Sequence, residues 1–419
     1  MNSLLALQDE QISKLNNVEK KKRLQKIRII RYLYVKGPRS NADICSRFGI
    51  SSPTSMALLN ELMAESLVEK QGRGESVGGR RPELYGLRDQ SLFVLGIDMG
   101  KFSTRMAIFD NNHNNITGVQ TFPIQLTKSV DSVEELVACA SNLLLSSGID
   151  TEKLMGIGIS MPGLVSSKDG RNYTYLLSDD TSLSLQELLK LRFGRPVYIQ
   201  NDVKSATLAE HRFGAARGKR DVLVLSIDWG IGLGVIMDGK LHNGTSGFAG
   251  EFGHVPFVEE GVLCHCGKRG CLETVASGQA LVREAREGLK AGTGSLLNQL
   301  PEAEIEKLNP KVVVEAANNG DQYAISLLAD MGTSLGRGIA TLIQLFNPEL
   351  IILGGAMAEA RQYLTTPVQQ AIHTYCMTQL SEKTRISLSG LGAHAGIMGS
   401  VATVMENIFE DQMKELSKT

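Results

Sequence analysis

Apolar residues follow helical spacing in the first ninety residues. Between residues 18 and 36 they are Leu24, Ile27, Ile30 and Leu33, which predicts a helix that ends at Gly37-Pro38. A second short helix is predicted from an N-cap at Ser40 to Phe48. A third is predicted with Ser52 as N-cap and Pro53 at its first helical position. Three short helices, the last two joined by a tight glycine turn, are typical of a helix-turn-helix.

The third helix has an apolar side and a polar beginning. We expect its apolar residues to face inward: Met56, Leu59, Leu62 and Met63. Ser52, Thr54 and Ser55 then remain at the exposed N-terminal end, where such helices contact base edges and phosphates. The alternative is an ordinary helical subdomain with polar caps.

Two short strands are predicted next, at 68–70 and 84–87, around a Gly- and Arg-rich tip at 72–82. This pattern indicates a wing. Its tip carries Arg80 and Arg81, and arginines on a flexible segment suit the negative potential of a narrow minor groove. The alternative is a solvated linker, because charged runs commonly just face water.

The body that follows repeats one arrangement of strands. Apolar runs at 93–98, 104–110 and 116–123 predict three strands. A second run at 221–228, a turn containing Gly230, Gly232 and Gly234, and short segments at 235–237 and 240–241 repeat the pattern. Two copies predict a duplicated α/β fold with a cleft between two lobes.

Between the copies, buried strands are predicted at 154–162 and 197–200. Asn201 and Asp202 directly follow the second of these. Because ligands of α/β sheets gather at the carboxyl ends of strands, both residues are placed in the cleft. Beyond about residue 278 the chain reads mainly as amphipathic helices, with one further strand at 350–353. The predicted domains are 1–90, 91–200 and 201–419, and the C-terminal helix could return to the first lobe.

Composition and charge narrow the class of protein. The chain has 419 residues, of which 42% are hydrophobic and 21% charged, as expected for a soluble protein with a large core. Residues 1–90 hold 16 Lys+Arg and 10 Asp+Glu, so a basic head precedes an acidic body although the net charge is only -1. With no signal peptide and no run of roughly 20 apolar residues, we expect a cytoplasmic protein that has no membrane contact.

Three of the six cysteines lie in one short window: Cys264, Cys266 and Cys271. Such clustering in a reducing compartment usually holds a metal, and three sulfurs with one imidazole form a closed, structural zinc set. His254 is the favoured imidazole, because its Gly-x-x-Gly-His turn can bend back onto the loop, and His265 is the rival. The other interpretation is three buried thiols and a core histidine.

Two carboxylates flank this window, Glu251 and Glu273. They could accept hydrogen bonds from a polyhydroxylated ligand. The hypothesis is therefore a zinc ion that holds a loop, and a loop that holds a sugar.

These residues resemble the ROK family of sugar kinases and sugar-responsive repressors nearly end to end. The most specific part is 250–274 (GEFGH…CHCGKRGCLET), followed by Gly230-Ile-Gly232-Leu-Gly234 and Asn201-Asp202. With the predicted head, the chain is similar to the repressor branch, which includes N-acetylglucosamine, glucose and xylose repressors. The resemblance implies an actin-like, ribonuclease H-like fold of two lobes behind a winged helix-turn-helix.

The resemblance also implies site residues. The zinc ligands fall on His254, Cys264, Cys266 and Cys271, and the sugar contacts on Asn201, Asp202, Glu251, His254 and Glu273. His254 would serve both sites through its two ring nitrogens. Asp202 occupies the position of the base that family kinases use.

The phosphate-binding turns depart from the kinase pattern. Family kinases carry Asp-x-Gly-Gly-Thr at the first turn, where Lys101 and Phe102 replace the last two residues, and Gly-Thr-Gly at the second, where Asp228-Trp229-Gly230 stands. An acid and an indole at a triphosphate site add repulsion and bulk. The expected function is thus a repressor that binds operator DNA as a homodimer or tetramer and responds to a sugar or sugar phosphate. An ATP-dependent hexose or N-acetylhexosamine kinase fused to a DNA-binding domain is the alternative.

Overall fold

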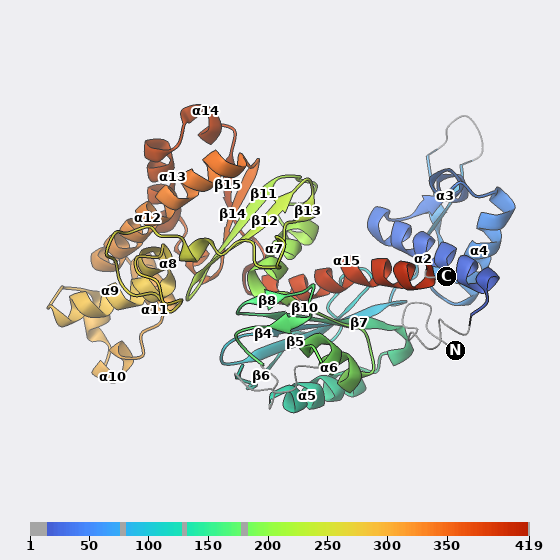
Figure 1. Cartoon of the computed structure of the whole chain (residues 1–419), viewed down its shortest axis with the longest axis horizontal. Coiled ribbons are helices and arrows are strands. Elements are labelled where there is room, and N and C mark those ends of the chain that lie inside the picture. The colour runs from blue at the N-terminus through green and yellow to red at the C-terminus, as the bar shows by residue number, and fades with distance from the viewer. Residues whose placement is uncertain (1–14, 76–80, 128–131, 177–182, 418–419) are drawn as a thin grey trace. The chain divides into compact units, whose positions relative to one another are not determined.

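The computed structural model describes residues 15–75, 81–127, 132–176 and 183–417. The chain divides into two compact units: Met1–Asn201 with Ser400–Thr419, and Asp202–Gly399. Figure 1 shows the elements in chain order. None of the described helices combines the length and apolar character that a membrane span requires.

The first unit begins with helices α2 (Asn17–Lys36), α3 (Asn41–Phe48) and α4 (Ser52–Ala64). A small sheet of order β1-β3-β2 accompanies them, with β1 (Arg39–Ser40) between α2 and α3, and with β2 (Val68–Arg73) and β3 (Glu83–Leu87) after α4. The helices predicted at 18–36 and 40–48 are confirmed, as are both strands of the predicted hairpin. Ser40 caps α3 through a reciprocal capping box with Asp43.

The predicted N-cap of the third helix is wrong by one residue. Ser51 is the N-cap of α4, and its hydroxyl accepts a hydrogen bond from the backbone N–H of Thr54 at 3.3 Å. Ser52 is therefore the first helical residue and Pro53 the second. The N–H groups at both positions have no intrahelical partner, so proline is tolerated at either.

A five-stranded sheet of order β10-β7-β4-β5-β6 lies at the centre of the rest of the first unit. Its strands are β4 (Phe93–Met99), β5 (Thr104–Asp110), β6 (Gln120–Phe122), β7 (Leu154–Met161) and β10 (Val197–Asn201). β4 pairs antiparallel with β5 and parallel with β7, and β7 pairs parallel with β10. The third strand is shorter than the predicted 116–123.

Helices cover both faces of this sheet (Figure 1). On one face α5 (Ser132–Ser146) and α6 (Leu185–Phe193) complete the core, and on the other lies the C-terminal helix α15 (Ala395–Ser417). A Cβ at Gly158 of β7 would lie 2.0 Å from the carbonyl oxygen of Ser400. The glycine therefore lets the helix backbone rest directly on the strand.

The second unit contains a sheet of the same design, of order β13-β12-β11-β14-β15. Its strands are β11 (Val222–Ile227), β12 (Ile231–Met237), β13 (Lys240–Leu241), β14 (Leu350–Gly354) and β15 (Arg385–Leu388). As in the first sheet, the first three strands pair antiparallel and the last two add in parallel. This repeat confirms the predicted duplication, whereas β15 was not predicted.

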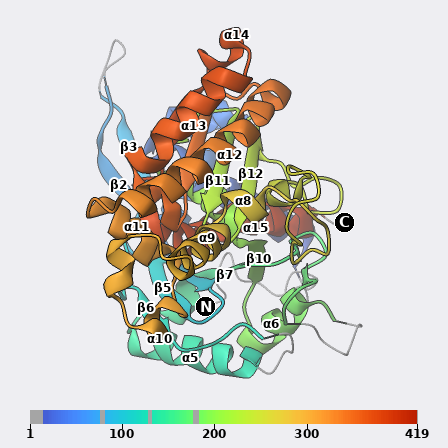
Figure 2. The same cartoon turned by 90° about the vertical axis from the view of Figure 1, so that its left-hand side faces the viewer.

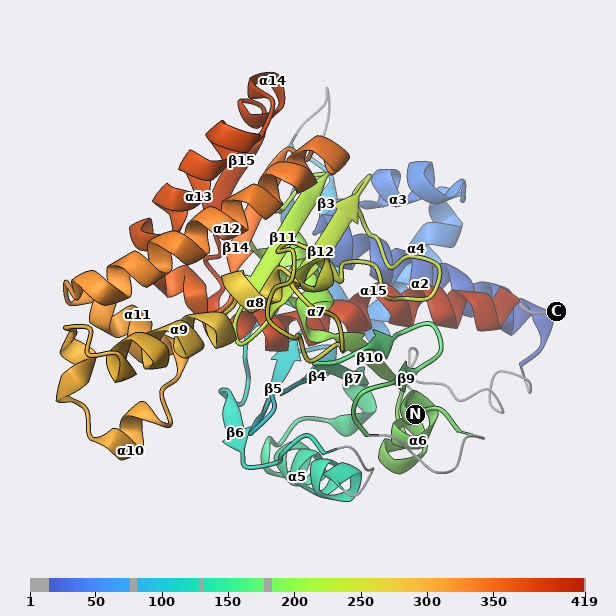
Figure 3. The same cartoon turned by 60° about the vertical axis from the view of Figure 1, so that its left-hand side comes forward.

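The two faces of the second sheet pack against different helices (Figures 2 and 3). Leu223, Leu225 and Ile227 of β11 join a core with the large helical layer: α9 (Gly278–Lys290), α11 (Pro310–Asn318), α12 (Gln322–Phe346) and α13 (Gln362–Tyr375). The helix α7 (Asp202–Phe213) packs on β11 and β12.

Gly232 and Gly234 lie within strand β12, so their predicted place in a turn is wrong. Their role is to let α7 approach the strand. A Cβ at Gly232 would lie 2.4 Å from Val203, and one at Gly234 would lie 1.8 Å from the hydroxyl of Thr207. Glycine at alternate strand positions commonly marks such close packing.

Candidate sugar and metal site

The loop after β13 is fixed to strand β12 by two glycines. Gly250 has a φ of 103°, and a Cβ there would lie 2.0 Å from the carbonyl oxygen of Leu233. A Cβ at Gly253 would lie 2.5 Å from the carbonyl oxygen of Ile231. Only glycine fits both contacts. The residues that follow them, Glu251 and His254, are therefore held by backbone packing.

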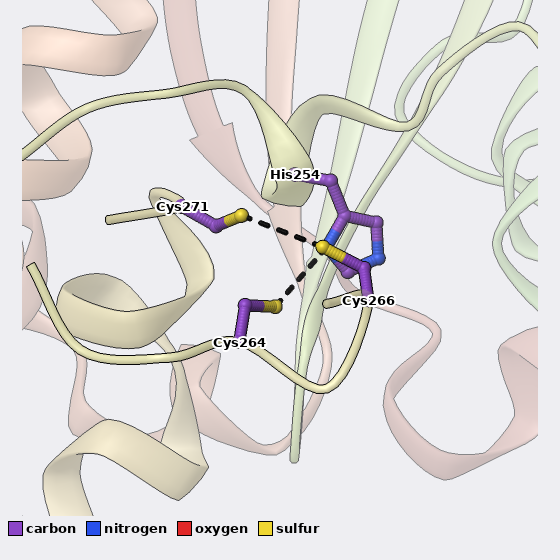
Figure 4. Close-up of side chains that lie close together, drawn as sticks. All are labelled: His254, Cys264, Cys266 and Cys271. Carbon is purple, nitrogen blue, oxygen red and sulfur yellow. Dashed lines mark hydrogen bonds between the residues drawn. The ribbon is translucent and has the colours of Figure 1, made fainter. Parts of the chain in front are cut away.

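Four metal-type side chains meet in this loop. The ligand atoms of His254, Cys264, Cys266 and Cys271 all lie within 4.8 Å of one another, and Figure 4 shows them pointing to a common centre. The sulfurs of Cys266 and Cys271 are 3.6 Å apart, and the sulfur of Cys264 is 3.5 Å from Nδ1 of His254. Tetrahedral zinc with arms of about 2.3 Å to sulfur and about 2.0 Å to nitrogen places its ligands about 3.5–3.8 Å apart. The four residues fit such an ion.

The thiols have unequal acidities. Burial raises the pKa of Cys264, and it raises the pKa of Cys271 to about 12. Interactions with the neighbouring cysteines also contribute to both shifts. A hydrogen bond from the backbone N–H of Lys268 lowers the pKa of the more exposed Cys266. A metal binds thiolates, so binding here releases protons.

His265 takes a different partner. Its Nδ1 lies 3.0 Å from Oε1 of Glu273, and its ring packs edge-on against His254 with centroids 5.0 Å apart. The structure brings His254, and not His265, together with all three sulfurs.

The carboxylates differ in burial. Glu273 is buried at 7% exposure, and its Oε2 accepts a hydrogen bond of 3.1 Å from the backbone N–H of Ile231. Glu251 is half exposed, with Oε2 3.9 Å from Nε2 of His254. That separation is too long for a hydrogen bond, so both groups can accept or donate to a ligand. The imidazole thus has one nitrogen toward the cysteines and the other toward Glu251.

The division of the chain into two units falls between Asn201 and Asp202. In the first unit Asn201 ends β10 and its amide donates to the carbonyl of Gly163 at 3.1 Å. In the second unit Asp202 begins α7, and its Oδ1 accepts from the N–H of Val203 at 2.9 Å. Of the five predicted sugar contacts, the structure brings Glu251, His254 and Glu273 together within one unit.

Lys204 was missed by the sequence reading. It is 4% exposed, and its ammonium donates to the carbonyl oxygen of Gly247 in the loop that leads to Glu251. Burial lowers its pKa, and the charge of Glu251 opposes that shift. A lysine two residues into a helix that packs on a sheet is the only sequence signal for this role, and it is a weak one.

The turn between β11 and β12 carries an exposed carboxylate, Asp228, that is hydrogen-bonded within the chain. Oδ1 of Asp228 accepts from the backbone N–H of Ala356 at 2.7 Å, and Oδ2 accepts from the hydroxyl of Ser226 at 3.1 Å. At the first turn, Asp98 pairs with Arg105, and the ammonium of Lys101 lies 5.3 Å from the ring centre of the exposed Phe102.

The predicted DNA contacts have different environments. Ser52 and Thr54 are exposed at the start of α4, and the Ser52 hydroxyl accepts from the amide of Asn41 at 2.8 Å. Ser55 is fully buried, so the prediction that it is exposed is wrong. It lies one helical turn after Ser51, on the face that packs inward. Arg81 is exposed, and Arg80 lies outside the described residues.

Two α/β units that share one strand order define an actin-like fold. The carboxylates beside the loop of His254 and three cysteines are in keeping with the sugar-kinase class of that fold. The chain belongs to the ROK family, whose model matches residues 94–407.

Similar proteins fall into two groups. A xylose repressor of Caldicellulosiruptor bescii is 27% identical over 395 residues, covering 92% of this chain and 96% of its own. The crystal structure of a ROK family transcriptional regulator, a homologue of the Escherichia coli Mlc protein, covers 96% of this chain and 100% of its own, with 25% identity and a TM-score of 0.80. A ROK family glucokinase from Streptomyces griseus, solved with glucose and AMPPNP, covers 74% of this chain and 97% of its own, with 28% identity and a TM-score of 0.62.

Proposed function

We propose that this protein is a cytoplasmic, sugar-responsive transcriptional repressor that binds operator DNA as a homodimer or tetramer. The observation that carries the proposal is its helical head. The similarity to the Mlc-like regulator extends over 96% of the chain, whereas the glucokinase matches only 74%. A basic segment of three helices and a hairpin, ahead of a sugar-kinase-type body, is what a sugar-controlled DNA-binding protein requires.

The DNA-binding surface is the start of α4 with the hairpin. Ser52 and Thr54 are exposed there and supply hydroxyl groups for phosphates and base edges. Arg81 stands at the exposed base of the hairpin tip, and we assign Arg80 the same minor-groove role from the sequence alone.

The sugar is bound by Glu251, His254 and Glu273, with Asn201 and Asp202. The first three already converge, and their oxygens and ring nitrogen can receive and donate several hydrogen bonds to vicinal hydroxyls. Resident zinc on His254, Cys264, Cys266 and Cys271 would cross-link the loop and fix the imidazole for the ligand. Its contribution is structural, because four protein ligands leave no open position.

Kinase activity is not expected, although Asp202 keeps the position of a base. The carboxylate of Asp228 already accepts a hydrogen bond from the N–H of Ala356, and its negative charge would repel a phosphate at this turn. Positioning and charge stabilisation provide most of the rate enhancement in phosphoryl transfer. A turn that carries a carboxylate where the phosphate would bind therefore loses much of that enhancement.

Sugar binding is expected to change DNA affinity by roughly 5–150-fold, which corresponds to a coupling free energy of about 1–3 kcal/mol. DNA affinity itself should fall steeply with salt, because phosphate contacts release counterions.

The test starts from an operator selected with the purified full-length protein from random DNA. Fluorescence anisotropy then measures its affinity with and without a panel of hexoses, pentoses, N-acetylhexosamines and their phosphates. An affinity that no sugar alters would refute the proposal. In parallel, ADP release is followed across the same panel, and sugar-dependent turnover that Asp202→Asn abolishes would favour the kinase.

A further inference from the structure

The buried carboxylate of Glu273 is held from two sides. Its Oε2 accepts a hydrogen bond of 3.1 Å from the backbone N–H of Ile231, which strand β12 keeps in place. Its Oε1 lies 3.0 Å from Nδ1 of His265. An ionised carboxylate can only accept hydrogen bonds, so the ring nitrogen of His265 is the donor. One partner is thus fixed by the sheet, and the other is a side chain of the loop that carries the cysteines.

The chain around His265 is folded into a tight turn. The N–H of Cys264 donates to the carbonyl of Lys268 at 2.8 Å, and the N–H of Gly267 donates to the carbonyl of Cys264 at 2.9 Å. The imidazole of His265 is 66% exposed, yet its ring packs edge-on against that of His254, with an angle of 77° between the ring planes. The turn and this ring contact together restrain the orientation of the donor.

Glu273 needs such a restraint in order to bind a hydroxyl group well. The terminal torsion of a glutamate side chain is soft, so a carboxylate that is held at one oxygen can still rotate. A second donor on the other oxygen removes that freedom before a ligand arrives, and less entropy is then lost on binding. Each oxygen keeps a further lone pair that can accept from a hydroxyl group. The hydrogen bond from His265 therefore orients Glu273 and leaves it able to bind a sugar.

We propose that His265 is a positioning residue of the sugar site, which holds the carboxylate of Glu273 and the ring of His254 in the orientation that sugar hydroxyls require. This inference rests on the proposed function. The ligand atoms of His254, His265 and Glu273 also lie within 4.8 Å of one another, so the test has to separate this role from metal binding. Loss of one hydrogen bond to a carboxylate should weaken sugar binding about tenfold.

The test uses full-length protein and calorimetry with D-glucose, D-xylose, N-acetyl-D-glucosamine and the phosphates of these sugars. His265→Leu keeps a side chain of similar size without the donor, and it should bind the sugars that the parent protein binds about tenfold more weakly. His265→Asn places an amide N–H close to the position of Nδ1 and should retain most of the parent affinity. Zinc content and Tm should equal those of the parent protein in both variants, because the metal ligands and the backbone of the turn are unchanged.

Lys268→Leu is the matched control, because it makes the same kind of change at an exposed position of the same turn. It should leave the sugar affinity unchanged. Parent-like affinity in His265→Leu, an equal loss of affinity in His265→Asn, or loss of zinc from either variant overturns the positioning role while the repressor proposal stands. Failure of every sugar and sugar phosphate to bind the parent protein overturns both.

Discussion

Replacing Cys266 by serine should remove the proposed metal and loosen the loop that carries Glu251 and His254, two of the proposed sugar-binding residues. The metal would join His254 to Cys271 across a segment whose internal strand pairing is confined to two isolated bridges, Pro256 with Cys271 and Leu263 with Arg269. A cross-link that closes a loop of roughly this length contributes about 3 kcal/mol to the free energy of unfolding.

That loss has a measurable size. For a domain of the size of the second unit, Asp202–Gly399, a change of 1 kcal/mol lowers Tm by about 2–4 °C. Cys266→Ser should thus melt about 6–12 °C below the parent protein. Zinc, measured by mass spectrometry on protein purified without added metal, should fall from about one per chain to none.

Two controls sharpen the result. Cys139→Ser removes a half-buried thiol from α5 of the first unit and should keep both the zinc and the parent Tm. The histidines separate the two candidate ligand sets, since His254→Ala should lose zinc whereas His265→Ala should retain it. A full zinc complement in Cys266→Ser, or zinc lost from His265→Ala but kept in His254→Ala, would contradict the assigned set.

Three further changes test individual contacts. Ser55→Ala should raise the free energy of unfolding by about 1 kcal/mol, seen in urea melts, and leave operator affinity unchanged, because its buried hydroxyl has no hydrogen-bond partner. Lys204→Met should lower the free energy of unfolding by about 1–3 kcal/mol and weaken sugar binding in calorimetry, because the buried carbonyl of Gly247 loses its donor. Burial alone would raise the pKa of Asp321, but hydrogen bonds from Ser295 and nearby backbone N–H groups lower it below the usual 3.8. The stability that the ionised Asp321 contributes to the fold is therefore fully present above about pH 4 and is lost as the pH falls through the lowered pKa. Asp321→Ala should cost about 1–2 kcal/mol at neutral pH and flatten the acid limb of a Tm-against-pH curve.

The sequence predicted those parts of the fold that follow from local patterns. Helix caps such as Ser40 and the long apolar runs of β4, β7 and β11 are read from neighbouring residues, and both sheets formed where such runs stood. The repeated strand order followed from the repeated pattern. The meeting of His254 with Cys264, Cys266 and Cys271 was also predicted, because three cysteines in one short window already lie close together along the chain.

The errors have a common physical cause, which is that packing between distant segments decides them. Gly232 and Gly234 read as turn residues, yet α7 needs them inside a strand. Ser55 reads as a polar surface residue, yet the helix rotates it inward. Lys204 drew no prediction from the sequence, because the carbonyl that it binds lies more than forty positions along the chain.

Gly250 and Gly253 allow the loop to pack directly against backbone carbonyls of β12, so the positions of Glu251 and His254 are set by the sheet itself. A substitution at either glycine would disturb the fold before it changed which ligand the protein prefers. A change of ligand preference in this fold is therefore expected at side chains that do not lie against the sheet backbone, with both glycines kept.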